Sequence, residues 1–193
     1  MRFNTLREWL RWQETLNPHE IELGLDRVAA VWRRLQRTPV PFCVIAVGGT
    51  NGKGSAVAML EAVLIAAGYR VGAYMSPHLV RYNERVRLQG QEVDDAALCA
   101  AFDQVDQARG DTALTYFEFG TLAALCIFQE AGLDAVVLEV GLGGRLDAVN
   151  VLDADAALVT SVGIDHVEWL GADRNAIGRE KAGILKNGVP AIS

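Results

Sequence analysis

The sequence contains few cysteines, and their spacing suits neither a metal site nor a disulfide framework. The three cysteines, Cys43, Cys99 and Cys126, lie far apart, and each stands in an apolar segment. Zinc sites use closely spaced cysteines, and small disulfide-linked folds are rich in cysteine. We therefore expect three reduced, buried thiols.

A long hydrophobic run and an excess of positive charge are also missing. No apolar stretch reaches the roughly 20 residues of a membrane-spanning helix, and residues 1–4 lack the apolar core of a signal peptide. The formal net charge is −6, which argues against a nonspecific nucleic-acid binder and against an anionic membrane surface. We therefore expect a cytoplasmic protein with no nucleic-acid or membrane partner.

Apolar residues and glycine are plentiful by contrast. Hydrophobic residues make up 51% of the 193 residues, and there are 19 glycines, so the chain can form a domain of ordinary size with a substantial core. Segments with helical apolar spacing alternate with short, continuous apolar runs. The pattern predicts strands over 42–47, 69–75, 135–140, 156–160 and 189–192, a short strand or hairpin arm over 85–88, and helices within 6–35 and over 56–67, 93–108, 116–131 and 173–182.

Apolar strands that alternate with helices are typical of a parallel sheet covered on both faces. Such a sheet binds ligands at the carboxyl ends of its strands. The Pro-Val-Pro sequence at residues 39–41 ends the N-terminal helical region. The chain stops on an expected strand with no helix after it, which we interpret as a fragment of a longer protein or a sheet without its last layer.

The most informative segment is the glycine-rich turn at residues 48–55, Gly-Gly-Thr-Asn-Gly-Lys-Gly-Ser. Because it joins an expected strand to an expected helix, its backbone N–H groups and the helix dipole would form an anion cradle. Lys53 adds a full charge for the outer phosphates of a nucleotide. The turn departs from the common phosphate-loop pattern, since Val47 replaces its first glycine and Gly54 separates Lys53 from Ser55. We expect it to bind ATP or a relative, and a ligand-free turn is the alternative.

Glu139 lies inside an otherwise apolar strand. A buried carboxylate is costly unless it is paired or bound to a metal. A metal that bridges nucleotide phosphates would satisfy it, and a salt bridge to Arg145 or Lys181 is the alternative. Ser55 and Ser76 offer the oxygen donors that magnesium prefers, although either hydroxyl could instead cap a helix or a turn.

Two other polar residues have ordinary explanations on spacing alone. His166 follows an expected strand, where a single histidine is usually structural, and imidazole is a softer ligand than magnesium prefers. Lys181 follows Glu180 in an expected helix, where a solvated face is usual. The run Gly-Leu-Gly-Gly-Arg at 141–145 is unusually rich in glycine, which predicts a close approach of its backbone to a ligand.

Together these segments resemble the folylpolyglutamate synthase and dihydrofolate synthase family, a branch of the Mur-type ATP-dependent amide ligases. The resemblance rests on ordered blocks at 49–55, 76–79, 83–85, 117–118, 139–150, 165–166 and 180–184. It implies an α/β fold with a doubly wound, mostly parallel sheet and a P-loop, truncated before the C-terminal ligase domain. Residues 1–40 would form a helical segment packed on the ATPase domain. Residues 41–193 would form the P-loop ATP-binding domain, incomplete at its C-terminal end.

The resemblance also implies roles for individual residues. ATP would be bound by Gly49, Thr50, Asn51, Gly52, Lys53, Gly54 and Ser55, with Lys53 on the phosphates. One magnesium ion would be held by Ser55, Ser76 and Glu139, and a second by His166 and a carbamylated Lys181. The implied catalytic residues are Lys53, Glu139, His166 and Lys181. The cofactors are then ATP and two magnesium ions, with a monovalent cation left open.

Three segments border the pterin-containing substrate in family members that also act on dihydropteroate. The matching residues are Leu23, Gly24, Leu25 and Asp26; Thr115, Tyr116, Phe117 and Glu118; and Leu146, Asp147 and Ala148. The implied ligase activates the carboxylate of pteroate or folate as an acyl phosphate and couples it to L-glutamate, which serves dihydrofolate synthesis and folate polyglutamylation. Dihydropteroate, folates and L-glutamate are the implied substrates, and the implied state is a monomer.

Two other functions stay open at this point. The chain could be a nucleotide-binding module without activity, or a Mur-type ligase that acts on a cell-wall precursor or uses another amino acid. The chains of the family are much longer and carry a C-terminal domain that holds the glutamate amine. No residue here clearly supplies a site for that amine. Val149 stands where the family often has threonine, which is a mild departure.

Overall fold

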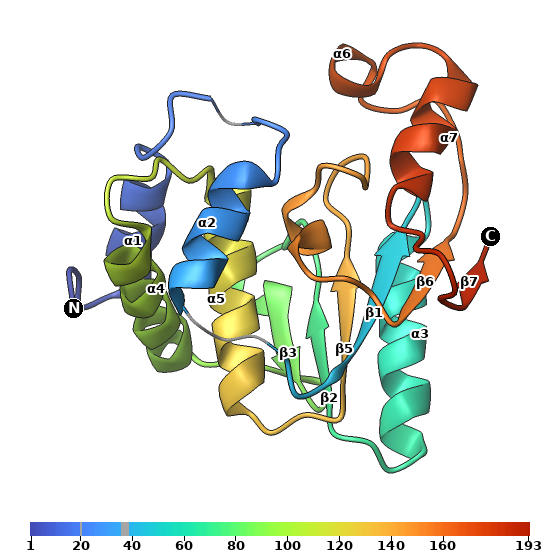
Figure 1. Ribbon diagram of the computed structural model, residues 1–193. Coiled ribbons are helices and arrows are strands. Elements are labelled where there is room, and N and C mark those ends of the chain that lie inside the picture. The colour runs from blue at the N-terminus through green and yellow to red at the C-terminus, as the bar shows by residue number, and fades with distance from the viewer. Residues whose placement is uncertain (20, 36–38) are drawn as a thin grey trace.

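The computed structural model describes residues 1–19, 21–35 and 39–193. These residues form a seven-stranded sheet with helices on both faces (Figure 1). The strands are β1 (Cys43–Gly48), β2 (Val71–Tyr74), β3 (Val86–Leu88), β4 (Gln91–Glu92), β5 (Ala135–Glu139), β6 (Ala156–Val159) and β7 (Ala191–Ile192). The helices are α1 (Leu6–Gln13), α2 (Asp26–Leu35), α3 (Lys53–Ala66), α4 (Asp95–Arg109), α5 (Tyr116–Glu130), α6 (Val167–Leu170) and α7 (Arg174–Ala182), with 3-10 turns η1 (Tyr82–Arg85) and η2 (Ala148–Val151).

The sheet is mostly parallel, as the sequence predicts. Its strand order is β4-β3-β2-β5-β1-β6-β7. The pairs from β2 to β7 are parallel, whereas β3 and β4 form an antiparallel hairpin at one edge. Val47 of β1 lies opposite Glu139 of β5, and Tyr74 of β2 lies opposite Leu138. The carboxyl ends of these three central strands therefore meet at one edge of the sheet.

Helices cover both faces, which confirms the doubly wound α/β fold. On one face α3 lies against the strands, and its Val57 packs with Val47, Val71 and Val137 (Figure 1). On the other face α5 lies against the sheet, and α1, α2 and α4 lie outside it. Residues 118–128 of α5 are all buried, because this helix is enclosed by strands on one side and helices on the other.

The two N-terminal helices share the main hydrophobic core with the sheet. The side chain of Trp9 in α1 is fully buried. Its ring centroid lies 5.3 Å from that of Phe3 and 5.9 Å from that of Phe102 in α4. The start of α1 has a capping box, in which Thr5 and Glu8 bond each other's backbone N–H groups. The N-terminal segment is therefore anchored through a large aromatic contact.

We expect Trp9→Ala to lower the free energy of unfolding by roughly 3–5 kcal/mol, because it leaves a large cavity between α1 and α4. Chemical unfolding measured in urea tests this expectation. The matched control is Arg7→Ala, an exposed position in the same helix, which should change stability by less than about 0.5 kcal/mol. Equal stability of the two variants would show that α1 adds little to the core.

Several boundaries differ from those predicted. The helix after the glycine-rich turn begins at Lys53, three residues earlier than expected, and the second strand covers only Val71–Tyr74. The prediction that all three thiols are buried is wrong for Cys43, which is exposed, and correct for Cys99 and Cys126. Cys43 is the first residue of β1, and this strand is continuously buried only from Ala46 onward.

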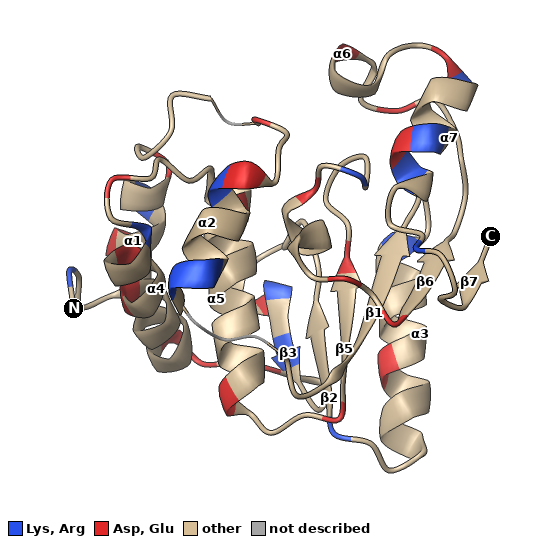
Figure 2. Ribbon diagram, viewed as in Figure 1, with Lys and Arg blue, Asp and Glu red and all other residues tan. Residues whose placement is uncertain are grey.

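Charged residues are concentrated outside the four central strands (Figure 2). Strands β1, β2 and β6 contain no charged residue, and β5 contains one, Glu139. Helices α1, α2, α4 and α7 contain charged residues of both signs, whereas α5 and α6 contain only acidic ones. In the described part of the chain, no helix has both the length and the apolar character needed to cross a membrane. The single acid in the central strands therefore stands out as a candidate functional residue.

Candidate nucleotide and substrate site

The glycine-rich turn forms a tight loop between the end of β1 at Gly48 and the start of α3 at Lys53. Gly49 and Gly52 have φ values of 141° and 83°, which favour glycine. A Cβ atom on Gly49 would lie 2.0 Å from the Oγ1 atom of Thr160. Glycine is therefore required at position 49 by both backbone conformation and space.

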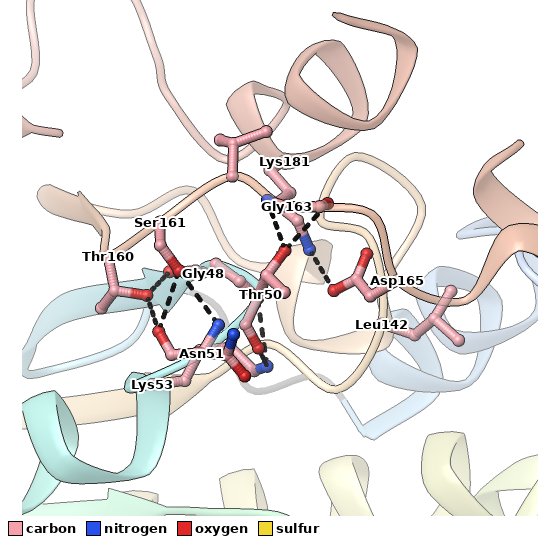
Figure 3. Close-up of polar contacts among 12 residues, drawn as sticks. Gly48, Thr50, Asn51, Lys53, Leu142, Thr160, Ser161, Gly163, Asp165 and Lys181 are labelled. Carbon is pink, nitrogen blue, oxygen red and sulfur yellow. Dashed lines mark hydrogen bonds and ion pairs between the residues drawn. The ribbon is translucent and has the colours of Figure 1, made fainter. Parts of the chain in front are cut away.

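The segment after β6 holds this loop in place (Figure 3). The backbone N–H of Thr50 donates to the carbonyl of Ser161 at 2.9 Å, and its Oγ1 accepts from the N–H of Gly163 at 3.0 Å. The hydroxyl of Thr160 donates to the carbonyl of Asn51 at 2.7 Å. Because β6 pairs with β1, the residues after β6 must lie beside the glycine-rich loop after β1. The hydroxyl side chains of Thr160 and Ser161 could therefore have been predicted from the sequence to hold that loop.

Lys53 lies at the first turn of α3, and its Nζ atom folds back over the loop. It donates to the carbonyls of Gly49 at 3.0 Å and Thr50 at 3.3 Å. The positive end of the α3 dipole and the ammonium group therefore act on the same space. A loop of this kind can bind the phosphates of a nucleotide.

Glu139, at the end of β5, is the carboxylate beside this loop. Its side chain is buried, and its Oε2 atom accepts a hydrogen bond from the N–H of Ser76 at 3.1 Å. A Cβ atom on Gly54 would lie 3.8 Å from Oε2. Burial raises the pKa of Glu139, while the N–H of Ser76 and the charge of Lys53 partly oppose this effect. The structure thus brings together a lysine, a carboxylate and a serine from three separate strand ends.

The alternative explanation for Glu139, a salt bridge to Arg145 or Lys181, does not hold. Arg145 Nη2 lies 3.0 Å from Glu180 Oε1, and Lys181 Nζ lies 3.0 Å from Asp165 Oδ2. Glu139 has no ion-pair partner among the described residues. Among the described residues, the N–H of Ser76 and the nearby charge of Lys53 favour its ionised form, and a bound cation would stabilise that form further.

The donors near the loop suit magnesium better than a softer metal. No three His, Cys, Asp or Glu side chains gather around one point in the part of the chain that the structure describes. Ser55, Ser76 and Glu139 can offer two hydroxyls and one carboxylate, all hard oxygen donors. Magnesium usually takes few protein ligands and completes its shell with water and phosphate oxygens. The residues present therefore fit magnesium.

Lys181 does not lie on a solvated helix face, which corrects the ordinary explanation from spacing. Only 1% of its surface is exposed, and its Nζ donates to Asp165 Oδ2 (Figure 3). The other carboxylate oxygen of Asp165 is buried without a hydrogen-bond partner. A carbamate on Lys181 would meet the negative charge of Asp165, so this ion pair must open before the amine can be modified. The spacing of Asp165 and Lys181 did not predict this pair.

A cavity of about 850 Å³ extends from this loop to the N-terminal helices. Lys53, Ser76 and His166 line it at the loop. Of the residues expected at the substrate, it is lined by Leu23, Gly24, Thr115, Tyr116, Phe117, Glu118, Leu146, Asp147 and Ala148. Leu25 and Asp26 do not line it, because Leu25 packs on the core and Asp26 begins α2. The cavity also reaches Gln13, Asn17 and His19, which the sequence did not single out.

Two carboxylates of the cavity wall, Glu118 and Asp147, accept hydrogen bonds from other residues of the chain. Glu118 accepts the N–H of Thr115 at 2.8 Å and pairs with Arg27 at 3.1 Å. Asp147 accepts the N–H groups of Leu142 at 2.8 Å and Val149 at 3.0 Å. Glu118 therefore stabilises the start of α5, and Asp147 the start of η2, and both segments form part of the cavity wall.

Burial raises the pKa of Asp147 to about 6, against hydrogen bonds from backbone N–H groups and the charge of Lys53. Because the folded chain holds this proton more tightly than the unfolded chain, stability should fall by about 3 kcal/mol as the pH rises from about 3 to about 7. Asp147→Asn should remove this part of the pH dependence. Urea unfolding across this range measures it, with Asp153→Asn, an exposed acid, as the control. A constant difference between Asp147→Asn and the parent chain at every pH would contradict the expectation.

The glycines of the 141–144 segment approach other parts of the protein, and Gly141 also lines the cavity. A Cβ atom on Gly141 would lie 2.7 Å from the ring of Phe117. One on Gly144 would lie 2.8 Å from the carbonyl oxygen of Glu180 in α7. Close packing against α5 and α7 therefore favours glycine at positions 141 and 144, and close approach of this backbone to a ligand stays a prediction.

Comparison with known proteins adds to this geometry. The family model of the Mur ligase middle domain matches residues 47–191. The chain belongs to the Mur ligase middle domain family. The matched region begins at the end of β1 and includes the P-loop, Lys53 and Glu139.

Relatives of this Mur ligase middle domain are considerably longer. The dihydrofolate synthase/folylpolyglutamate synthase of Escherichia coli K12 is 58% identical over 188 residues, which cover 97% of this chain and 44% of the relative. The Mycobacterium tuberculosis protein of the same name is 38% identical, over 91% of this chain and 38% of its own. The chain therefore spans less than half the length of these relatives.

Solved structures resemble the Mur ligase middle domain described here over almost its whole length. E. coli FolC in complex with DHPP and ADP has a TM-score of 0.95 at 56% identity, covering 98% of this chain and 46% of that one. The bifunctional folylpolyglutamate synthase/dihydrofolate synthase of Yersinia pestis, complexed with AMPPNP and Mn ion, has a TM-score of 0.91 at 55% identity, with coverages of 98% and 46%.

Proposed function

We propose that this chain is the ATP-binding part of a ligase that couples L-glutamate to dihydropteroate and to folates. The observation that carries the proposal is the convergence of Lys53, Ser76 and Glu139 at the mouth of a glycine-rich loop. The relatives named dihydrofolate synthase/folylpolyglutamate synthase support the substrate class.

ATP binds with its phosphates on the loop from Gly49 to Ser55, and Lys53 neutralises the outer phosphates. The hydrogen bonds from the Thr160–Gly163 segment support this role, because they hold the loop open without help from a ligand. Ser55, Ser76 and Glu139 would hold magnesium, which would neutralise phosphate charge when bound. The bound nucleotide in the E. coli and Y. pestis structures supports the same assignment.

A second magnesium ion belongs with His166 and Lys181 in this proposal. His166 lines the cavity next to the loop, whereas Lys181 is buried behind Asp165. Once the Lys181–Asp165 pair opens and the ammonium group loses a proton to water, the neutral amine would add to carbon dioxide and lose a second proton, giving a carbamate. The carbamate is negatively charged and would suit a metal that an ammonium group would repel.

The pterin-containing substrate occupies the cavity of about 850 Å³. Its heterocycle suits the aromatic and backbone wall formed by Tyr116, Phe117 and residues 146–148. Its carboxylate then extends toward Lys53 and Ser76, which line the same cavity at the loop. A cavity of this size can enclose most of such a ligand.

The chemistry is a transfer of the terminal phosphoryl group followed by amide formation. The substrate carboxylate attacks the γ-phosphate of ATP, forms an acyl phosphate and expels ADP. The amine of L-glutamate then attacks the acyl carbon, and inorganic phosphate leaves as the amide bond forms. Lys53 and the oxygen ligands act by positioning the reactants and neutralising charge, which is the main catalytic requirement of such a step.

Calorimetry with MgATP, beside an assay for ligation of labelled glutamate to dihydropteroate and to folate, tests the proposal. Binding of MgATP with ligation supports it, and failure to bind MgATP contradicts it. Binding without any ligation would identify the chain as a nucleotide-binding module. Competition by a uridine-linked peptide, with no effect of dihydropteroate, would instead indicate a ligase of a cell-wall precursor.

A further inference from the structure

Arg85 is a cation of the cavity wall that none of the steps above uses. It is the last residue of η1, is half-buried, and lines the cavity with His78 and Tyr116. Its Nε atom donates to Nδ1 of His78 at 2.8 Å. Since a guanidinium group only donates, Nδ1 of His78 carries no proton. His78 therefore orients Arg85 without neutralising it.

The guanidinium group of Arg85 lies over two aromatic rings. Its Cζ atom lies 5.3 Å from the ring centroid of Tyr82 and 5.7 Å from that of Tyr116. Contacts of this kind attract a cation but leave its charge in place. Burial raises the pKa of Tyr82 well above its usual value, and that of Tyr116 to about 12, so both phenols stay neutral. Arg85 is thus held in one position with its charge intact.

No acidic side chain among the described residues pairs with Arg85. Glu84, its neighbour, accepts the N–H groups of Leu79, Val80 and Arg81. The acids of the cavity are otherwise engaged or exposed. Glu22 and Glu118 pair with Arg27, Asp147 accepts backbone N–H groups, and Glu14 is exposed at the end of α1. A half-buried cation that has no acidic partner among the described residues and lies on a cavity wall is suited to bind an anionic group of a ligand.

We propose that Arg85, oriented by His78, Tyr82 and Tyr116, binds the reacting carboxylate of the pterin-containing substrate. This inference rests on the proposed function. It names a residue that selects and positions the pterin-containing substrate, whose carboxylate accepts the phosphoryl group. The Nε–H is taken by His78 and the Tyr74 hydroxyl also accepts from the guanidinium group, which leaves further Nη N–H groups to bond the oxygens of a carboxylate. Ser76, beside Glu139, lies only two residues before His78, which places the arginine next to the part of the cavity where phosphate is transferred.

The test compares pteroate with its primary amide, which has nearly the same shape but no charge. Binding of both to the 193-residue chain is measured by calorimetry without ATP, magnesium or glutamate. The parent chain should prefer pteroate by roughly 10- to 100-fold, as expected for a charge-assisted, two-point contact. Arg85→Met should abolish this preference, and Arg85→Lys should restore only part of it.

Arg81→Met is the matched control, because Arg81 begins the same turn, is exposed, pairs with Asp95 and does not line this cavity. It should keep the full preference. General damage to the fold would weaken both ligands equally, so the ratio of the two affinities reports on the carboxylate contact alone. An unchanged ratio in Arg85→Met would overturn the inference.

Two further outcomes separate this inference from the proposed function. If Arg85→Met weakens binding of pteroylglutamate but not of pteroate, the arginine binds the glutamate tail and the inference is wrong. If the parent chain binds pteroate and its amide equally and yet ligates glutamate, the inference is wrong while the function stands. A preference for pteroate that depends on Arg85, in a chain that does not bind MgATP, would support the inference and contradict the ligase.

Discussion

Replacing Lys53 with alanine should weaken binding of MgATP by roughly 100-fold. The ammonium group lies over the glycine-rich loop, where it donates to the carbonyls of Gly49 and Thr50. When phosphate enters, hydrogen bonds between the lysine and charged oxygens contribute about 1.5–3 kcal/mol each, and a 100-fold loss corresponds to about 2.7 kcal/mol. Calorimetric titration with MgATP measures the change directly.

Lys186→Ala is the control for the loss of one positive charge. Lys186 lies outside the cavity and pairs with the exposed Asp153 at 3.2 Å. This variant should bind MgATP like the parent chain. Because Lys53 also bonds two loop carbonyls, thermal unfolding without nucleotide should be recorded for both variants. Binding of MgATP by a folded Lys53→Ala variant at parental affinity would remove Lys53 from the nucleotide site.

The second large effect is expected from Glu139→Gln. This buried carboxylate forms no ion pair among the described residues, and burial raises its pKa although the charge of Lys53 partly opposes that effect. Glutamine keeps an oxygen that can accept the N–H of Ser76 but removes the charge. We therefore expect the free energy of unfolding not to fall in the absence of magnesium. The gain in ATP affinity that magnesium produces should drop by roughly 100-fold, at the upper end of the losses seen when residues that support a metal site are changed.

Glu61 in α3 provides a matched control, because it is a buried glutamate with the opposite surroundings. It pairs with Arg87 and accepts the N–H of Gly90 at 3.1 Å. Glu61→Gln leaves Arg87 without its counter-ion and should lower the free energy of unfolding by roughly 1–3 kcal/mol. It should leave the effect of magnesium on ATP affinity intact. The reverse result, with Glu61 and not Glu139 controlling the effect of magnesium, would overturn the metal assignment.

Much of the fold could be predicted, because its signals are local. The apolar runs of β1, β5 and β6 and the helical spacing of α4 and α5 follow directly from residue type. The glycine-rich loop was also clear, since a strand, four glycines, a lysine and a helix occur in succession. Boundaries were less certain. The start of α3 at Lys53 depends on the left-handed conformation of Gly52, which no apolar pattern reports.

The site could be predicted in part. Lys53, Ser76 and Glu139 each follow or end a strand of the parallel sheet, so their approach follows from topology. The pair of Lys181 with Asp165 could not be predicted, because residues 16 positions apart meet only when α7 folds back over the end of β6. The same holds for Arg85, whose charge and half-burial look ordinary until the rings of Tyr82 and Tyr116 are seen around it.

The sequence by itself determined the class of fold, the phosphate loop and the presence of an acid within an apolar strand. These features depend on residue type and short-range order. Only the tertiary structure decided which charges are neutralised. Arg145 and Lys181 have partners within the chain, whereas Glu139 and Arg85 have no ion-pair partner among the described residues. The physical reason is that the energy of a charge depends on its burial and on the distance to its partner, and both are set by segments far apart in the sequence.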